Sequence, residues 1–235
     1  MKCSIVVPCY NEAKNLPLIV SRFAEVLTRP DVEIILVNNG SNDDSAMVME
    51  SLKRDNTFLK VVEVPKNLGY GFGVLSGLRE SKAEFLGWTH ADMQTDPLDS
   101  LLALELLERD KNPDQTMVKG LRQGRNLWDN FFTLGMSIFE SLYLEKFLWD
   151  INAQPNLFPR SFFDSWLNPP HDFSLDLYVL YQARVMGLTL KRLPVNFPPR
   201  IHGSSSWNTG IVSRWKFIKR TILFSLHLKR EISRH

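Results

Sequence analysis

The sequence predicts an α/β fold in which a mostly parallel, Rossmann-like sheet is flanked by helices. Three observations support this prediction: short apolar runs recur along the first hundred residues, segments with helical spacing separate them, and a polar cluster follows each run. Continuous apolar strands are typical of parallel sheets that are buried on both faces. The length of 235 residues suits one domain, or one domain with an appendage.

Strand-like and helix-like segments alternate along the first half of the chain. The expected strands are apolar runs, and they cover residues 3–9, 32–37, 58–64 and 84–89. The expected helices follow them and cover residues 15–27, 43–54 and 70–80. Further along, HDFSLDLYVLYQARVMG predicts the start of another helix, with Asp172 at its beginning.

Each expected strand ends in a polar cluster. The four clusters are PCYNE, VNNGSND, PKNLGYG and THADMQ. Because ligands of such sheets bind at the carboxyl ends of the strands, the coincidence predicts a site of nucleotide-binding type. A Gly-rich turn does not follow the first strand, and no Walker-type lysine motif is present, so an ordinary dinucleotide or P-loop enzyme is disfavoured.

Composition narrows the class of protein. The hydrophobic content of 44% and charged content of 23% are ordinary for a globular protein with a sizeable core. Cys3 and Cys9 would lie roughly 20 Å apart on one strand, too far for a disulfide, and no zinc framework is expected. No signal-peptide pattern precedes the first strand, so a cytoplasmic protein is expected.

Charge is distributed unevenly. Residues 1–176 carry 17 basic and 25 acidic side chains, whereas residues 177–235 carry 11 basic and one acidic. A basic end predicts an anionic partner surface, either membrane or nucleic acid, or a solvated end. Over residues 209–235 we expect a basic amphipathic helix at the membrane headgroup boundary; the alternative is a helix folded back onto the domain. Its apolar stripe would comprise Ile211, Trp215, Ile218, Ile222 and Leu226.

Four segments together resemble a known enzyme family. IVVPCYNEAKNL, ILVNNGSND, KNLGYGFGVLSGL and HADMQTDP occur in the order found in family 2 glycosyltransferases of the GT-A fold. The chain is most similar to the branch of dolichyl-phosphate mannose synthase and the polyprenyl-phosphate sugar transferases. The resemblance is close over residues 3–100 and looser over 117–208. It implies a GT-A domain over residues 1–208, with a nucleotide-sugar half at 1–115 and an acceptor half at 116–208.

The resemblance gives a function to the cluster at the end of the fourth strand. In this family an acidic motif there holds a divalent cation on the donor diphosphate, and Asp92 and Gln94 stand in its place. Mg²⁺ takes oxygen ligands, usually one or two carboxylates plus phosphate oxygens and water. His90 replaces the usual acid: as a ligand it would favour Mn²⁺, and otherwise it would face the diphosphate or lie in the core. The expected cofactor is Mg²⁺ or Mn²⁺.

Donor-binding residues are implied in the same way. Asn39 takes the place of the acid that accepts from the pyrimidine N3–H, which an amide can also do, or it serves the turn. Asn67 and Gly71 would lie under the ribose and phosphates, or serve the turn alone. The set implied for a UDP- or GDP-sugar is Pro8, Tyr10, Glu12, Asn39, Asn67, Gly71, Ala91, Asp92, Arg200 and His202.

The second half is expected to bind the acceptor. Lys119, Arg122 and Arg125 lie just past an expected short strand and would hold a lipid phosphate or product diphosphate, or form an exposed basic loop. Gln154 would orient sugar or phosphate groups, or belong to a turn. Asp176 matches the family's acceptor-side carboxylate, where a base would deprotonate an attacking hydroxyl; an ionised lipid phosphate needs no base.

These observations predict an inverting, metal-dependent enzyme that moves a sugar from a nucleotide sugar to a polyprenyl phosphate, with Asp92 and Asp176 as catalytic residues. One alternative is transfer to a hydroxyl of a lipid-linked glycan. The other is an inactive relative that only binds nucleotide sugars. The expected location is cytoplasmic, peripherally on the cytosolic face of an anionic membrane, and no nucleic-acid partner is expected.

Overall fold

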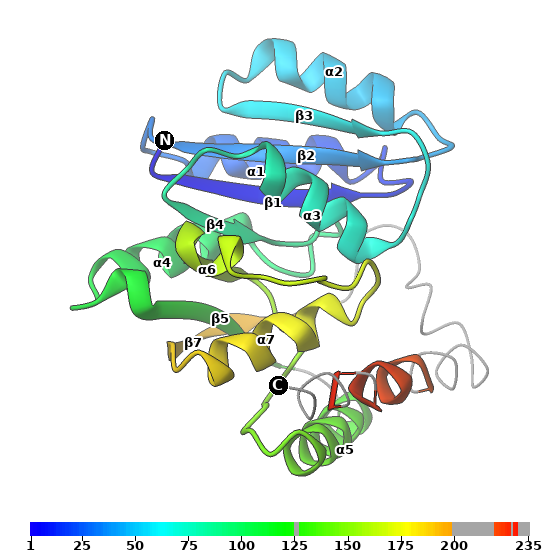
Figure 1. Cartoon of the computed structure of the whole chain (residues 1–235). Coiled ribbons are helices and arrows are strands. Elements are labelled where there is room, and N and C mark those ends of the chain that lie inside the picture. Colours follow the sequence, from blue (N-terminus) through cyan, green and yellow to red (C-terminus); the bar gives the residue numbers. More distant parts are fainter. Residues whose placement is uncertain (125–126, 199–218, 227, 230–235) are drawn as a thin grey trace.

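A seven-stranded sheet forms the centre of the computed structural model, which describes residues 1–124, 127–198, 219–226 and 228–229. The strand order is β3-β2-β1-β4-β6-β5-β7 (Figure 1). Every neighbouring pair is parallel except the two that involve β6, which confirms the predicted mostly parallel sheet. The strands are β1 (Cys3–Cys9), β2 (Val32–Asn39), β3 (Leu59–Val64), β4 (Phe85–Trp88), β5 (Thr116–Gln123), β6 (Asn156–Pro159) and β7 (Thr189–Asn196).

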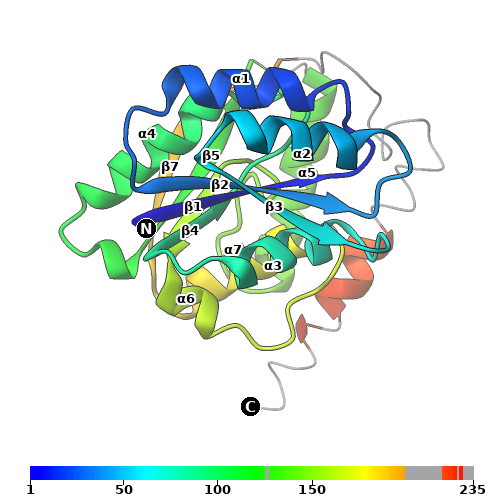
Figure 2. The same cartoon turned by 90° about the horizontal axis from the view of Figure 1, so that it is seen from above.

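Helices cover both faces of this sheet (Figure 2). One face carries α1 (Leu16–Val26), α2 (Ser45–Asp55) and α4 (Pro97–Glu108). The other carries α3 (Tyr70–Glu80), α6 (Arg160–Asp164) and α7 (Leu175–Val185). Helix α5 (Leu127–Tyr143) lies beyond α7 at one end of the molecule, and one 3₁₀ turn, η1 (Pro113–Gln115), precedes β5 (Figure 1).

Two hydrophobic cores result, one on each face of the sheet. Neighbouring residues of β1 separate between them, because successive side chains of a strand point to opposite faces. Val6 packs in the core under α3 and α7, whereas Ile5 and Val7 pack in the core under α1 and α4. Cys3 and Cys9 are buried free thiols, which confirms the prediction that they form no disulfide.

The predicted elements of the first half agree with the structure to within one or two residues at most ends. One prediction for the second half was wrong. Lys119 and Arg122 do not lie past a strand or on an exposed loop, because β5 extends through both of them to Gln123. Their positions on a paired strand decide which way their side chains point.

Gly120 on β5 lies close to the backbone of Gln154, which precedes β6. An added Cβ there would overlap the backbone carbonyl oxygen of Gln154, whereas an added Cβ at Gly135 on α5 would meet nothing within 4 Å. We expect Gly120→Ala to lower the free energy of unfolding by about 1–3 kcal/mol through overpacking. Gly135→Ala should leave it unchanged or raise it, since alanine favours helix. Urea unfolding measures both, and equal stability of the two variants would contradict the close approach.

The C-terminal segment, defined here as residues 219–226 and 228–229, is helical and packs on the domain. Ser225 Oγ donates to Glu140 Oε2 of α5 at 2.6 Å, and Ser225 and Leu228 are buried. Leu226, predicted for the apolar stripe of this helix, is exposed. These contacts agree with the folded-back alternative. Ile211, Trp215 and Ile218 lie outside the described residues.

Candidate functional site

The candidate site lies where the order of strands in the sheet reverses. β1 pairs with β2 on one side and with β4 on the other. The chain therefore leads from β1 through β2 to β3 in one direction, and β4 begins the other half of the sheet on the opposite side of β1. Ligands of doubly wound sheets bind at such a point, outside the carboxyl ends of the strands. Residues 10–12, after β1, and residues 90–94, after β4, flank it.

Asp92 is the carboxylate at the end of β4. Its side chain is only 3% exposed, and its Oδ1 accepts from the backbone N–H of Gln94 at 3.1 Å. This bond fixes the direction of the carboxylate. Gln94 is held in turn, since its Nε2 donates to the carbonyl oxygen of Pro198 at 3.1 Å. The turn after β4 therefore presents one oriented carboxylate with an amide side chain beside it.

The donor set here suits a cation shared with a ligand. Among the described residues, no three His, Cys, Asp or Glu side chains gather into a metal-binding group. A cation on a diphosphate needs only one or two protein carboxylates, because phosphate oxygens and water complete its coordination. Asp92, with the amide of Gln94, fits a Mg²⁺ or Mn²⁺ site of that shared kind and not a cage built by protein alone.

Asn39, at the end of β2, is held by the loop before α3. Its Nδ2 donates to the carbonyl oxygen of Gly69 at 3.0 Å, and the side chain is buried. Its Oδ1 finds no hydrogen-bond partner among the described residues. An acceptor without a partner is what recognition of a base N3–H requires. The atom is buried in this structure, and its role in base recognition stays a prediction.

Asn67 lies in the turn before α3, and Gly71 lies in the first turn of α3. Asn67 Oδ1 accepts from the Gly69 backbone N–H at 2.9 Å. An added Cβ at Gly71 would crowd the carbonyl oxygens of Pro170 and Asp172. Both residues therefore have the structural duty that was the alternative to donor binding, and a donor role for them stays a prediction.

The other residues predicted for the donor divide into described and undescribed ones. Glu12 Oε2 accepts from Asn15 Nδ2 at 2.6 Å, and Tyr10, the first residue after β1, is exposed. Pro8 lies on β1 and Ala91 is buried beside Asp92. Arg200 and His202, as well as Arg125 from the set predicted for the acceptor, lie outside the described residues.

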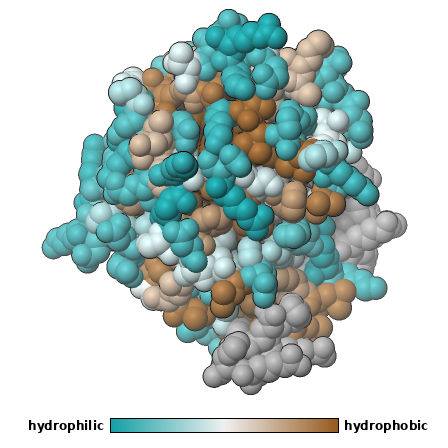
Figure 3. Space-filling model, turned by 45° about the horizontal axis from the view of Figure 1, so that its top comes forward, coloured by the Kyte–Doolittle hydropathy of each residue, from teal (hydrophilic) through white to brown (hydrophobic). Residues whose placement is uncertain are grey.

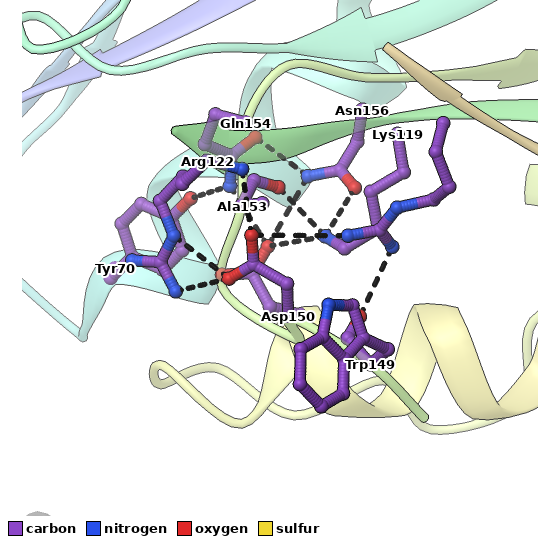
Figure 4. Close-up of polar contacts among 10 residues, drawn as sticks. Tyr70, Lys119, Arg122, Trp149, Asp150, Ala153, Gln154 and Asn156 are labelled. Atoms are coloured by element: carbon purple, nitrogen blue, oxygen red, sulfur yellow. Dashed lines mark hydrogen bonds and ion pairs between the residues drawn. The ribbon is translucent and has the colours of Figure 1, made fainter. Parts of the chain in front are cut away.

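A buried polar network joins β5, β6 and α7 in the half of the chain predicted to bind the acceptor (Figure 4). Lys119 Nζ is fully buried and donates to the Ala153 carbonyl oxygen at 2.8 Å and to Asn156 Oδ1 at 2.7 Å. It lies 4.0 Å from Asp176 Oδ1 at the start of α7. Lys119 thus points into the protein and compensates a buried carboxylate, which corrects its predicted place in a surface seat for phosphate.

Gln154 connects this network to α3. Its Nε2 donates to Asp176 Oδ1 at 2.9 Å and to the Tyr70 hydroxyl at 3.3 Å, and its Oε1 accepts from Asn156 Nδ2 at 2.6 Å. The ring of Tyr70 lies 5.7 Å from that of His90, measured between centroids. A chain of contacts therefore connects Asp176, through Gln154 and Tyr70, with His90, which lies two positions before Asp92.

Burial shifts both charged members of the network toward their neutral forms. It raises the pKa of Asp176, against the opposing positive charges of Lys119 and His90. It lowers the pKa of Lys119 to about 7, although Asp176 favours the charged form. A carboxyl whose pKa is raised by burial is suited to accept a proton near neutral pH.

Arg122 is also engaged within the protein. Its guanidinium Nε and its backbone N–H both donate to the carboxylate of Asp150 at 2.8 Å. Arg192 Nη2 lies 3.9 Å from Asp150 Oδ2. A phosphate at Arg122 would have to compete with Asp150. Sequence reasoning missed Asp150 and Tyr70; Tyr70 at least stands in the polar cluster that follows the third strand.

Comparison with known proteins decides the family. The chain matches the family described as "Glycosyl transferase family 2" over residues 4–163. The protein belongs to this family. It is a glycosyltransferase, as the four strand-end motifs imply.

One curated relative of this family 2 glycosyltransferase is the undecaprenyl-phosphate 4-deoxy-4-formamido-L-arabinose transferase of Yersinia enterocolitica. The two are 32% identical over 100 residues, which make up 41% of this chain and 30% of the relative. The aligned part thus spans less than a third of that protein. For this reason the activity of that whole enzyme is not assigned to this chain by the match.

Solved structures confirm the GT-A fold. Glucosyl-3-phosphoglycerate synthase from Mycobacterium tuberculosis, in complex with Mn²⁺, UDP and glucosyl-3-phosphoglycerate, matches with a TM-score of 0.71 at 15% identity, over 95% of this chain and 79% of that one. The mannosyltransferase PcManGT from Pyrobaculum calidifontis, in complex with GDP-Man and Mn²⁺, matches with a TM-score of 0.66 at 19% identity, over 86% and 58%. At these identities the likeness concerns the fold.

Proposed function

We propose that this glycosyltransferase moves a sugar from a UDP- or GDP-sugar to a polyprenyl phosphate. The observation that carries the proposal is the oriented, buried carboxylate of Asp92 at the point where the strand order reverses. Two findings support it: the Yersinia relative is named for transfer involving undecaprenyl phosphate, and structural neighbours were solved with UDP or GDP-Man and Mn²⁺. Residues 1–115 would bind the donor and residues 116–208 the acceptor.

The proposed reaction inverts the anomeric centre. The acceptor oxygen would attack the anomeric carbon from the face opposite the diphosphate, through a transition state with oxocarbenium character. A bound divalent cation supplies neutralisation of the charge that develops on the leaving diphosphate. Asp92 would hold and orient the diphosphate through that cation, and the network around Asp176 would face the attacking group. A phosphate acceptor is already ionised and needs no base.

A second candidate is transfer to a hydroxyl of a lipid-linked glycan. One observation favours it: Asp176 is buried and its pKa is raised, as suits a carboxylate base. In either case the acceptor is carried by a lipid, so we propose that the enzyme works peripherally at the cytosolic face of a membrane.

A nucleotide screen tests the donor side of the proposal. We expect UDP or GDP to raise the melting temperature in the presence of Mn²⁺ or Mg²⁺, and to have little effect after chelation. At about 100 times the dissociation constant a ligand adds about 2.7 kcal/mol, which corresponds to a few degrees for a protein of this size. Thermal shift with both metals, both nucleotides and AMP as control provides the measurement. Equal shifts with AMP, or shifts that ignore the metal, would count against the proposed donor site.

A further inference from the structure

The outward face of α5 is apolar and uncharged over the residues whose side chains the structure describes. Leu134, Ile138 and Leu142 recur at four-residue spacing and are 41%, 49% and 75% exposed. Phe139 beside them is also exposed. A surface helix of a globular protein ordinarily turns its polar residues toward water and its apolar stripe toward the core. This helix has apolar residues on its outer side as well.

The acid of this stretch is turned inward. Glu140 is the sole acidic or basic residue between Thr133 and Tyr143, and it is fully buried against Ser225 of the C-terminal segment. Burial raises its pKa to about 7. The helix thus buries its carboxyl group and exposes its leucine and isoleucine side chains. This is the reverse of the arrangement that contact with water favours. The arrangement favours an apolar environment along the outer side of α5.

The C-terminal segment lies along α5 and extends this surface (Figure 1). Besides the bond between Ser225 and Glu140, Lys229 Nζ donates to the Tyr143 carbonyl oxygen at 2.7 Å. The segment contributes the exposed side chains of Leu223 and Leu226. In the space-filling view, apolar side chains gather near the lower edge of the molecule, the end at which α5 lies in Figure 1 (Figure 3).

Cations border the apolar face. Lys146 is exposed three residues after α5 ends, and Lys219 is exposed at the start of the C-terminal segment. The sequence from 219 to 230 contains four Lys or Arg residues, one His and no acid. Basic groups beside an apolar helix face complement anionic headgroups above acyl chains.

The same surface is connected to the acceptor side of the site. Arg220 of the C-terminal segment forms an ion pair with Asp172 at 3.3 Å, and its guanidinium carbon lies 5.2 Å from the ring centroid of Phe173. Phe173 stacks on Tyr70 with 4.7 Å between centroids. Tyr70 in turn bonds to Gln154 in the network around Asp176. Helix α5 begins at Leu127, shortly after the carboxyl end of β5 at Gln123.

We propose that the α5 face, formed by Leu134, Ile138, Phe139, Leu142, Leu223 and Leu226, rests in the headgroup boundary of a bilayer that contains anionic lipids. None of the described helices has both the length and the apolar character that crossing a bilayer requires, so contact along the surface is the mode that these residues suit. The inference deepens the proposed function and rests on it, because a polyprenyl phosphate is itself a membrane lipid. It assigns membrane contact to α5 as well as to the basic end of the chain.

Vesicle binding tests this inference with the whole protein. The probes are vesicles of phosphatidylcholine with one quarter phosphatidylglycerol, and vesicles of phosphatidylcholine alone, without donor or acceptor. We expect the protein to sediment with the anionic vesicles. Ile138→Glu and Leu142→Glu should each weaken partitioning at least about tenfold, since burying one such side chain is worth that factor or more. Met47→Glu on α2, where Met47 is 69% exposed, is the matched control and should bind like the unaltered protein.

Further variants keep the outcome decisive. The double variant Ile138→Ser with Leu142→Ser removes apolar surface without adding charge, and circular dichroism verifies its fold. Unchanged sedimentation of these α5 variants, or an unaltered protein that ignores anionic vesicles, would overturn the inference. So would a lipid-free dimer that the variants dissociate, since the face would then belong to a second copy. Transfer to a detergent-solubilised acceptor reports on the proposed function separately, because its absence can coexist with full vesicle binding.

Discussion

Asp92→Asn is expected to abolish sugar transfer while leaving the protein folded. The asparagine can still accept the hydrogen bond from the Gln94 backbone N–H, so the turn after β4 keeps its geometry. It cannot supply the negative charge that holds a cation against the diphosphate. Loss of that charge stabilisation is worth several kcal/mol in the transition state, and we therefore expect turnover to fall by about 10³-fold or more.

The binding readout separates this effect from damage to the fold. Titration calorimetry with UDP or GDP should show a metal-dependent gain in affinity for the unaltered protein and none for Asp92→Asn. Asp114→Asn, at an exposed acid in η1 just before β5, is the control and should behave like the unaltered protein. Turnover that survives either Asp92→Asn or a chelator would remove Asp92 from the metal site.

Asp176→Asn is expected to distinguish the two acceptor classes. If the acceptor is a hydroxyl, Asp176 is the positioned base, and its loss should lower turnover by roughly 10²–10⁴-fold. If the acceptor is a phosphate, it is ionised without help, and turnover should fall far less. The asparagine carbonyl can still accept from Gln154 and Asn156, so most of the hydrogen bonds in the network are retained.

Stability must be measured alongside turnover for this variant. Asp176→Asn leaves Lys119 buried without its carboxylate, 4.0 Å away in the intact protein, so some loss of stability is expected from an uncompensated charge. Turnover with a polyprenyl phosphate and with a soluble sugar hydroxyl, both below the unfolding temperature, separates the two effects. A large loss with the phosphate acceptor would contradict the proposed reaction, and no loss with either acceptor would dismiss Asp176 as a base.

The first half of the fold is predictable from sequence for a physical reason. β1, β2 and β4 are buried on both faces, so they read as continuous apolar runs such as CSIVVPC, and the helices between them alternate regularly. The second half lacks this signal. β6 has only four residues and runs antiparallel between β4 and β5, and β7 carries charged residues at an edge of the sheet. Such strands depend on tertiary pairing more than on local pattern.

The site shows the same division. Asp92 is recognisable because a single acid follows an apolar run at a strand end. Lys119 is not recognisable as a buried residue, since a lysine ordinarily predicts exposure, and the partners that make burial tolerable come from distant parts of the chain. The compensation of Arg122 by Asp150 is hidden for the same reason. Sequence thus located the strand ends, whereas the pairing of charges required the assembled sheet.

The proposed transfer of sugar from a nucleotide donor to a polyprenyl phosphate can be measured directly. The most direct measurement incubates the protein with radiolabelled UDP- and GDP-sugars, undecaprenyl phosphate in detergent, and Mn²⁺ or Mg²⁺, and follows label into the organic phase. We expect label in the lipid only when metal, donor and lipid phosphate are present together, and no label with Asp92→Asn. No labelled lipid with any donor, or equal label after chelation, would contradict it.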